Sequence, residues 1–440
     1  MTRALTERSL VKALGVWGLA ASIINLTVGG GIFRLPATAA GALGAAAPVA
    51  YVVCAIAMGL IVICFAEAGS RVSLTGGLYA YVEVAFGPLT GFLCGVMLWV
   101  GITAATAAVS SFFADALGAL IPAAASGVGR AAAIVIVLTI LAAINIAGVR
   151  GASRFNALMT VSKLLPLVVL IAVGFGAMHS ENLRWTSTPA PTDLARASVI
   201  TIFAFLGVES ALIPSGEVVD PARTVPRAIA MAMIGVTLLY LAVQVVTQGI
   251  LGPELAAQKT PLAEAAGRVL GSGGRTLILV GSAISMFGYV SGMILAGPRM
   301  LYAFGRDRFL PQQLASIHPR FRTPHFAIAC HAMLVMVLAA TGTFEKLAII
   351  ANGSVLLVYA ACCLAVVQLR RRNVQEGGAP FRAPFASVIP VLAVVVIGWL
   401  LTSLSADEWK ALLAVVGVAV VIFVSSLPSR RTAAAAEGNP

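Results

Sequence analysis

Charged residues are scarce in this sequence. Asp, Glu, Lys and Arg make up 10% of its 440 residues, against roughly 25% in soluble domains. Hydrophobic residues make up 60%, and apolar runs of about 20 residues, enough to cross the hydrocarbon core of a bilayer as one helix, recur along the chain. The composition therefore excludes a soluble globular protein and predicts an all-α membrane protein.

Residues that hold metals or carry out covalent chemistry are also few. Of the four histidines, only His331 lies clearly inside an apolar run, and no acid or Cys is spaced to form a metal site with it. The six cysteines all lie in apolar runs, so we expect no disulfide framework. No phosphate-cradling loop or nucleophile elbow is present. We therefore expect no catalytic residue, no metal, no cofactor and no enzyme activity.

The basic residues, which give the chain a formal net charge of +12, lie in short loops between the apolar runs. They form no separate basic domain, so we expect no nucleic-acid partner. With the N-terminus in the cytoplasm, the loops on that side hold most of the basic residues, as the positive-inside rule requires. We expect a multi-pass protein of a bacterial-type cytoplasmic (inner) membrane, surrounded by lipid, with both termini cytoplasmic.

The apolar runs predict about 12 transmembrane helices. The first run resembles a cleavable signal peptide, but the many apolar runs that follow favour a retained helix. The expected spans are Ala13–Ala37, Ala46–Gly69, Leu89–Phe113, Ala131–Gly148, Ala157–Gly176, Leu194–Ser215, Pro226–Leu251, Thr276–Phe304, Phe326–Thr341, Leu347–Val367, Ser387–Leu404 and Trp409–Ser426.

The first run contains three consecutive glycines, Gly29, Gly30 and Gly31, near its middle. Each costs about 1 kcal/mol relative to Ala in a helix interior. One interpretation is close helix packing through small residues. The other is an unwound hinge that faces a polar cavity, because lipid cannot satisfy the N–H and C=O groups that unwinding exposes.

The sixth run carries a glycine and an acid, Gly207 and Glu209, deep in an apolar stretch. An ionisable residue in a membrane helix is costly and usually functional, although a structural Glu209, protonated or bonded to a neighbouring helix, is the alternative. The two interruptions lie five runs apart, so the two segments cross the membrane in opposite directions. This arrangement is typical of inverted-repeat secondary transporters.

We therefore expect one integral membrane domain over residues 1–440. Its first repeat would span about 13–178, its second about 193–370, and two extra helices about 383–427. Residues 428–440 would form a disordered tail, because they are small and polar.

Several longer motifs surround these interruptions. They are Gly29–Phe33, Gly76–Tyr81, Phe205–Ser210 continuing to Glu217, Asp220-Pro221, Pro226–Ile229, Pro298–Met300 and Phe304–Asp307. Through these motifs the chain resembles the amino acid/polyamine/organocation (APC) superfamily of permeases over nearly its whole length. The resemblance implies a LeuT-type fold, with five plus five helices, discontinuous first and sixth helices and two C-terminal helices. It also implies secondary active transport of amino acids by alternating access.

The resemblance implies how an amino acid is held. The N–H groups of the three glycines would cradle the α-carboxylate, and the carbonyls of Thr27, Phe203 and Leu206 would surround the α-ammonium. Phe203 and Phe205 would close over the substrate, unless they simply pack. Gly30 stands where relatives often carry Ser, which removes one hydroxyl contact. The expected substrate-binding residues are Thr27, Gly29, Gly30, Gly31, Phe203, Phe205, Leu206 and Gly207.

Three charged residues lie near the interruptions. Lys163, inside the fifth run, either extends its ammonium to the membrane surface or points it at the broken first helix. In the second case the resemblance implies that it replaces the sodium ion of sodium-coupled relatives, and proton-coupled uptake follows. Glu209 is a second candidate for proton coupling. Arg34 either attracts anions in the outer vestibule or is a helix-end charge that reaches water.

Other functional classes fit less well. A channel would need rings of carbonyls or charges, and a major-facilitator fold would break into parallel halves of six helices. The alternative function is an exchanger of amino acids with amines or of polyamines, which shares the same fold. The sequence leaves open which substrate is carried, whether transport is symport or exchange, and whether the protein is a monomer or a homodimer.

Overall fold

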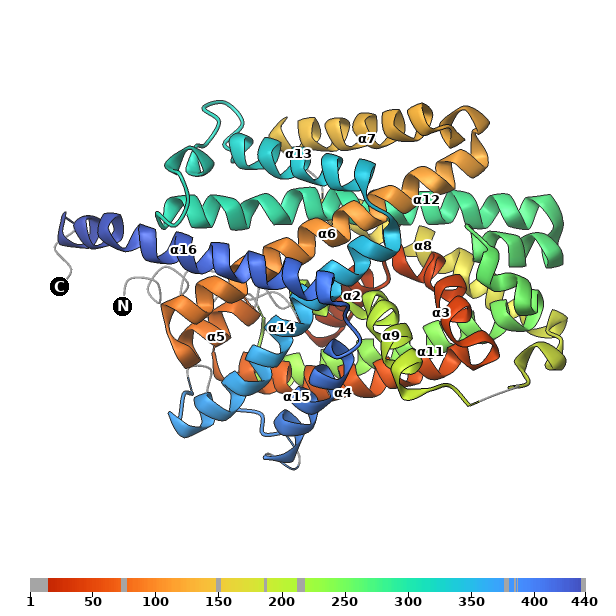
Figure 1. Ribbon diagram of the computed structural model, residues 1–440, viewed down its shortest axis with the longest axis horizontal. Helices are drawn as coiled ribbons and strands as arrows, with labels where there is room; N and C mark the ends of the chain where they lie inside the picture. Colours follow the sequence, from red (N-terminus) through yellow and green to blue (C-terminus); the bar gives the residue numbers. More distant parts are fainter. Residues whose placement is uncertain are drawn as a thin grey trace.

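The computed structural model describes residues 15–72, 77–147, 152–185, 188–211, 218–375, 380–383, 385 and 387–436. The regular elements in this part of the chain are helices (Figure 1). The α-helices are α2 (Val16–Thr27), α3 (Leu35–Leu43), α4 (Ala47–Arg71), α5 (Leu78–Phe86), α6 (Pro88–Leu120), α7 (Gly127–Ala147), α8 (Ala152–Gly174), α9 (Pro191–Thr201), α10 (Val208–Ala211), α11 (Pro221–Leu251), α12 (Pro261–Arg306), α13 (His325–Thr341), α14 (Phe344–Arg371), α15 (Val388–Leu401) and α16 (Ala406–Ala436).

Short 3-10 helices join or extend several of these elements. They are η1 (Gly31–Phe33), η2 (Gly44–Ala46), η3 (Pro122–Ala125), η4 (Phe175–Ala177), η5 (Ser180–Leu183), η6 (Ile202–Phe205), η8 (Gly252–Ala257) and η9 (Gln312–Ala315).

Many of the helices are long and apolar enough to cross a membrane. Among the described residues, 7 helical stretches meet this criterion, and four shorter helices are also apolar. Helices α7, α12 and α16 run close to the longest axis of the molecule (Figure 1). The fold is therefore that of a multi-pass helical membrane protein.

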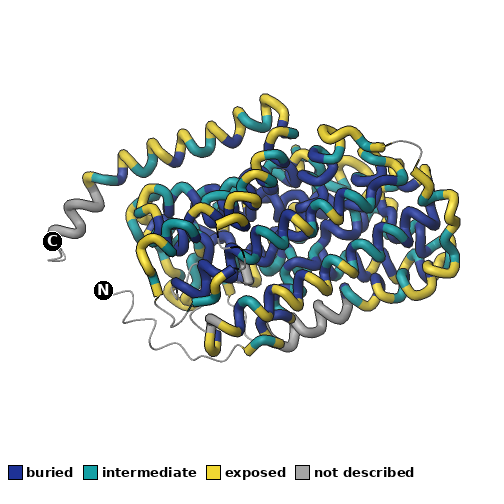
Figure 2. Tube along the Cα trace, turned by 90° about the horizontal axis from the view of Figure 1, so that it is seen from below, coloured by how far each residue is buried: buried dark blue, intermediate teal, exposed yellow. Residues whose placement is uncertain are grey.

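The buried residues lie in the middle of the bundle and the exposed ones at its periphery (Figure 2). In the most apolar stretch of α6, 78% of the residues are buried, against 17% in that of α16. Small residues permit this close packing: a Cβ at Gly101 of α6 would lie 2.6 Å from Val355 Cγ2 of α14. Thus α6 is central and α16 peripheral.

Several helix boundaries differ from the sequence-based expectation; helix α6, for example, ends at Leu120 instead of Phe113. Helix α12 begins at Pro261 instead of Thr276, and it bends at Gly271, whose φ of 67° is accessible to glycine. Proline suits the first turn of a helix, which explains the earlier start. Helix α16 continues through residues 428–436 to Ala436, where we expected a disordered tail, because alanine has the highest helix propensity. Residues 437–440 of that tail lie outside the described part.

The first and sixth expected spans are both interrupted. Helix α2 ends at Thr27, Val28 is non-helical (ψ 81°), and η1 and α3 follow. Helix α9 gives way to η6, an extended Leu206 and Gly207 with a φ of 117°, before α10 begins. The glycines therefore mark hinges in the backbone, and uninterrupted helices packed through small residues are not what the structure contains.

Candidate functional site

At the first break, the regular pattern of helix hydrogen bonds changes. The amide of Gly29 donates to Thr27 O at 2.8 Å, whereas a regular helix would direct it to Asn25 O, four residues back. The Nζ of Lys163, on α8, donates to Asn25 O instead. Lys163 is 5% exposed, so its ammonium points at the broken helix and not at the membrane surface. A cation at this C-terminal end of α2 is favourable, because the helix dipole is negative there.

The amides that follow the first break have no such partner. In the described part of the chain, the N–H groups of Gly30 and Gly31 donate to no protein acceptor, while Gly30 O and Gly31 O accept from Phe33 and Arg34. Consecutive amides of this kind form a concave site that suits an anion. Of the three glycine amides expected to cradle a carboxylate, these two therefore have no acceptor among the described residues.

At the second break, the amide of Gly207 donates to an acidic side chain of the same segment. The amide of Gly207 donates to both carboxylate oxygens of Glu209, at 3.0 and 2.9 Å. The hydroxyl of Tyr359, on α14, donates to Glu209 Oε2 at 2.6 Å. Glu209 is 6% exposed and Tyr359 fully buried. Glu209 therefore caps the second break and bonds to a neighbouring helix.

The two breaks lie against each other. A Cβ at Gly207 would come within 2.5 Å of Leu26 O, a backbone atom that cannot move aside, so only glycine fits at this position. The hydroxyl of Tyr240, on α11, lies 3.0 Å from Thr27 O and 2.8 Å from Ala204 O. Thus Tyr240 contacts a buried carbonyl from each break, including the Thr27 carbonyl that we expected to hold the α-ammonium.

A buried asparagine side chain donates a hydrogen bond to α9, the helix that leads into the second break. The Nδ2 of Asn352, on α14, donates to Val199 O of α9 at 2.6 Å. Sequence reasoning did not single out Asn352, Tyr240 or Tyr359. Their signal was a polar side chain inside an apolar run, since buried polar groups in a membrane protein need partners.

Side chains from three other helices cover the glycines of the first break. A Cβ at Gly29 would lie 3.3 Å from the ring of Tyr289 on α12. One at Gly31 would lie 2.8 Å from the ring of Phe203. The Phe203 ring packs edge-on against Phe344 of α14, with 5.5 Å between the centroids.

The two phenylalanines expected at the site have different surroundings. Phe203 reaches the glycines, as described above. The ring of Phe205 instead packs edge-on against Tyr240, with 5.3 Å between the centroids. Of the two, therefore, only Phe203 contacts the expected carboxylate cradle.

Arg34 has partners at some distance along the chain. Its Nη2 forms an ion pair with Glu345 Oε1 at the start of α14, at 3.0 Å, and its Nη1 donates to Lys259 O at 2.9 Å. It thereby links the broken first helix to α14 and to the segment before α12. That segment borders a cavity of about 460 Å³, lined by Ala114, Asp115, Gly118, Ala119, Ala124, Ala125, Arg130, Ala257, Gln258, Lys259, Thr260, Glu264 and Arg275.

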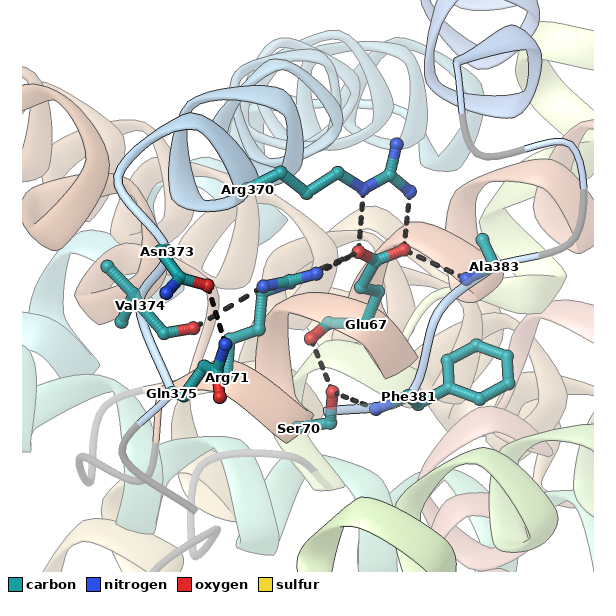
Figure 3. Close-up of polar contacts among 9 residues, drawn as sticks. All are labelled: Glu67, Ser70, Arg71, Arg370, Asn373, Val374, Gln375, Phe381 and Ala383. Carbon is teal, nitrogen blue, oxygen red and sulfur yellow. Dashed lines mark hydrogen bonds and ion pairs between the residues drawn. The ribbon is translucent and has the colours of Figure 1, made fainter. Parts of the chain in front are cut away.

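A buried charge cluster holds the opposite end of α14 (Figure 3). Glu67 of α4, fully buried, accepts from Arg71 Nη2 at 2.8 Å and from Arg370 Nε at 2.6 Å. It also accepts from the amide of Ala383 at 3.0 Å. Since a buried carboxylate is costly unless paired, these contacts fix the end of α4, the end of α14 and the segment that follows.

A helical membrane bundle in which two adjacent broken helices expose backbone groups has the architecture of a membrane transporter. The chain matches the family described as Amino acid permease over residues 14–432 and belongs to that family. It is a permease and not an enzyme, and its predicted APC membership is confirmed.

Three curated relatives of Bacillus subtilis match most of their length. The chain is 29% identical to the methylthioribose transporter, over 97% of this chain and 95% of the relative. It is 28% identical to the serine/threonine exchanger SteT, over 88% of this chain and 90% of the relative. It is 26% identical to the branched-chain amino acid permease BcaP, over 88% of this chain and 87% of the relative.

Proposed function

We propose that this permease takes up amino acids across the cytoplasmic membrane by alternating access, coupled to protons. The observation that supports this best is the pair of amides at Gly30 and Gly31, which donate to no described protein acceptor beside the first break. An α-carboxylate is the anion that every amino acid brings to such a site. The carbonyls of Thr27, Phe203 and Leu206 would receive the α-ammonium.

The proposal includes the arrangement of the spans. Twelve segments would cross the membrane: the broken pair α2–α3 and the broken pair α9–α10, together with α4, α6, α7, α8, α11, α12, α13, α14, α15 and α16. The first five would form one repeat and the next five an inverted copy, with α15 and α16 added. Both termini would lie in the cytoplasm.

Lys163 would couple the proton to the substrate. Its ammonium contacts Asn25 O at the end of α2, where a sodium ion would otherwise be favourable. When Lys163 loses its proton, this contact between α8 and α2 weakens, and the broken helix is able to move relative to α8. Binding and release of one proton would thus accompany each transport cycle.

An exchanger is the second candidate, because one relative is named a serine/threonine exchanger. Exchange would require substrate on both sides of the membrane and no proton gradient. Glu209, held by Gly207 and Tyr359, would then be the group that responds to pH. A carrier of methylthioribose, named for another relative, would transport a molecule without a carboxylate.

Uptake of radiolabelled amino acids into proteoliposomes, with and without an inward proton gradient, tests the proposal. We expect gradient-driven accumulation that Lys163→Ala reduces at least about 100-fold, since the variant removes the coupling charge itself. Lys410→Ala, which changes an exposed lysine paired with Asp407, is the matched control and retains uptake. Uptake that needs internal substrate and ignores the gradient would establish exchange, and uptake of methylthioribose alone would refute amino acid transport.

A further inference from the structure

No side chain fits at the middle glycine of the first break. A Cβ at Gly30 would lie 2.7 Å from Met286 Cγ of α12 and 2.9 Å from Val109 Cγ1 of α6. Neither atom is the loose end of a flexible chain: Met286 Cγ lies mid-chain, and valine has a stiff χ1. Both residues are buried. A thioether and an isopropyl group therefore pack directly beside Gly30.

The side chains that cover the three glycines carry no charge. They are Tyr289 over Gly29, Met286 and Val109 over Gly30, and Phe203 over Gly31. Behind Phe203 lies Phe344, which also approaches Phe112 of α6 with 6.0 Å between the ring centroids. An amino acid held by its carboxylate at these glycines would therefore place its side chain among apolar and aromatic groups.

The charged groups nearest the two breaks already have partners. Lys163 donates to Asn25 O, Glu209 accepts from Gly207 and Tyr359, and Arg34 pairs with Glu345. Arg34 is thus neutralised by an ion pair, whereas Lys163 and Glu209 bond to uncharged groups of the chain. A charged substrate side chain among the apolar and aromatic groups that cover the glycines would carry a large desolvation cost, so we expect the site to favour substrates with neutral side chains.

Hydroxyl groups of α6 near Val109 are also occupied. Ser110 Oγ donates to Thr106 O at 2.7 Å, and Thr106 Oγ1 donates to Ile102 O at 2.6 Å. Both hydroxyl hydrogens therefore serve the helix backbone. A polar substrate side chain would have to compete with these bonds for a donor.

We infer that Val109, Met286 and Phe203 form a side-chain pocket that selects amino acids with neutral, apolar side chains. The inference rests on the proposed amino acid transport. Hydrophobic pockets discriminate by about 10- to 200-fold for each methylene. The permease therefore prefers leucine over serine by about 10- to 100-fold in kcat/KM, and it transports lysine, arginine and glutamate less well than either.

The first experiment measures kcat/KM for radiolabelled leucine, serine, lysine and glutamate in proteoliposomes. A preference for leucine supports the inference. Equal or better transport of a charged amino acid overturns it while amino acid transport stands, and equal transport of serine overturns it in favour of a polar contact, for which Ser285, buried without a partner among the described residues, is available. Failure of all amino acids refutes the proposed function as well.

Variants test whether this pocket sets the preference. Gly30→Ser alone is expected to lower uptake of every substrate, because its Cβ collides with Met286 and Val109. Combining Gly30→Ser with Val109→Ala and Met286→Ala provides the space, and the leucine-to-serine ratio should fall by about tenfold. Met293→Ala shortens another buried methionine of α12, which is not among the side chains nearest a Cβ at any of the three glycines. It is the matched control and should leave the ratio unchanged.

Ligand-dependent thermal stabilisation in detergent checks binding without transport. Leucine should raise the unfolding temperature of the unsubstituted protein more than serine does, because a ligand that binds only the folded state stabilises it according to its affinity. The triple variant should show the smaller difference. An unchanged leucine preference in a triple variant that unfolds cooperatively would overturn the assignment of these residues.

Discussion

The two broken helices satisfy their exposed backbone groups with opposite charges. At the first break, the ammonium of Lys163 donates a hydrogen bond to the carbonyl of Asn25. The amides of Gly30 and Gly31 donate to no described residue. At the second break, the carboxylate of Glu209 accepts a hydrogen bond from the amide of Gly207. Two consecutive amides at the first break thus donate to no described residue, whereas the Gly207 amide at the second break donates to the chain's own acid.

This difference supports separate tasks for the two breaks in the proposed transport. The amides of Gly30 and Gly31 donate to no described residue, so we propose that the anionic end of a substrate binds there. The second break is held by its own acid and by α14. Tyr240 joins the two by contacting Thr27 O and Ala204 O, which keeps their carbonyls at a fixed separation.

After Lys163→Ala, the largest expected effect comes from removing the acid of the second break. Glu209→Ala leaves the buried Gly207 amide and the Tyr359 hydroxyl without their acceptor, at about 1 to 3 kcal/mol for each group. We expect kcat/KM for leucine in proteoliposomes to fall about 100-fold.

Glu209→Gln separates the cap from the charge. Its amide oxygen is able to accept from Gly207, and its NH2 group is able to donate to the Tyr359 oxygen. We expect it to retain most of the gradient-driven uptake, because the coupling charge is placed on Lys163. Loss of the proton dependence in Glu209→Gln would instead make the second break the coupling site and reverse the comparison.

The positions of both breaks follow from the sequence because their residues contradict the local pattern. Three glycines weaken a helix, and an acid in an apolar run needs a compensating partner. Lys163 belongs to the same class, and its contact with Asn25 O agrees with one of the two orientations considered for it. In each case the residue type alone is costly in an apolar helix, so the position stands out in the sequence before the rest of the fold is known.

The surroundings of the breaks do not follow from the sequence. Helices α6 and α12 are apolar on most sides, so periodicity does not reveal that Val109 and Met286 are the residues that face Gly30. The partner of Arg34 is equally hidden, since Glu345 lies 311 residues away along the chain. Such contacts depend on how the helices cross, and the pattern of a single sequence does not reveal this crossing.

An intermediate effect is expected from the residue that joins the breaks. Tyr240→Phe keeps the ring against Phe205 but removes the hydroxyl from the carbonyls of Thr27 and Ala204. Losing one buried hydrogen bond costs about 1.4 kcal/mol, so the KM for leucine should rise about tenfold, because the Thr27 carbonyl, one of those proposed to receive the α-ammonium, is no longer fixed. A fall in kcat at unchanged KM would instead show that Tyr240 controls the movement of the breaks and not binding.

The smallest expected effect is at Asn352, which supports only the second break. Asn352→Ala removes the donor to Val199 O, but it also removes the buried Oδ1 of Asn352, which has no partner among the described residues. The two changes partly offset each other, leaving a cost of about 1 kcal/mol. If the substrate's carboxylate binds at the first break, as proposed, this cost should appear as a lower unfolding temperature in detergent with the KM for leucine almost unchanged. A rise in KM as large as that of Tyr240→Phe would mean that both breaks bind the substrate equally. The difference in charge between the breaks would then not assign substrate binding to the first break.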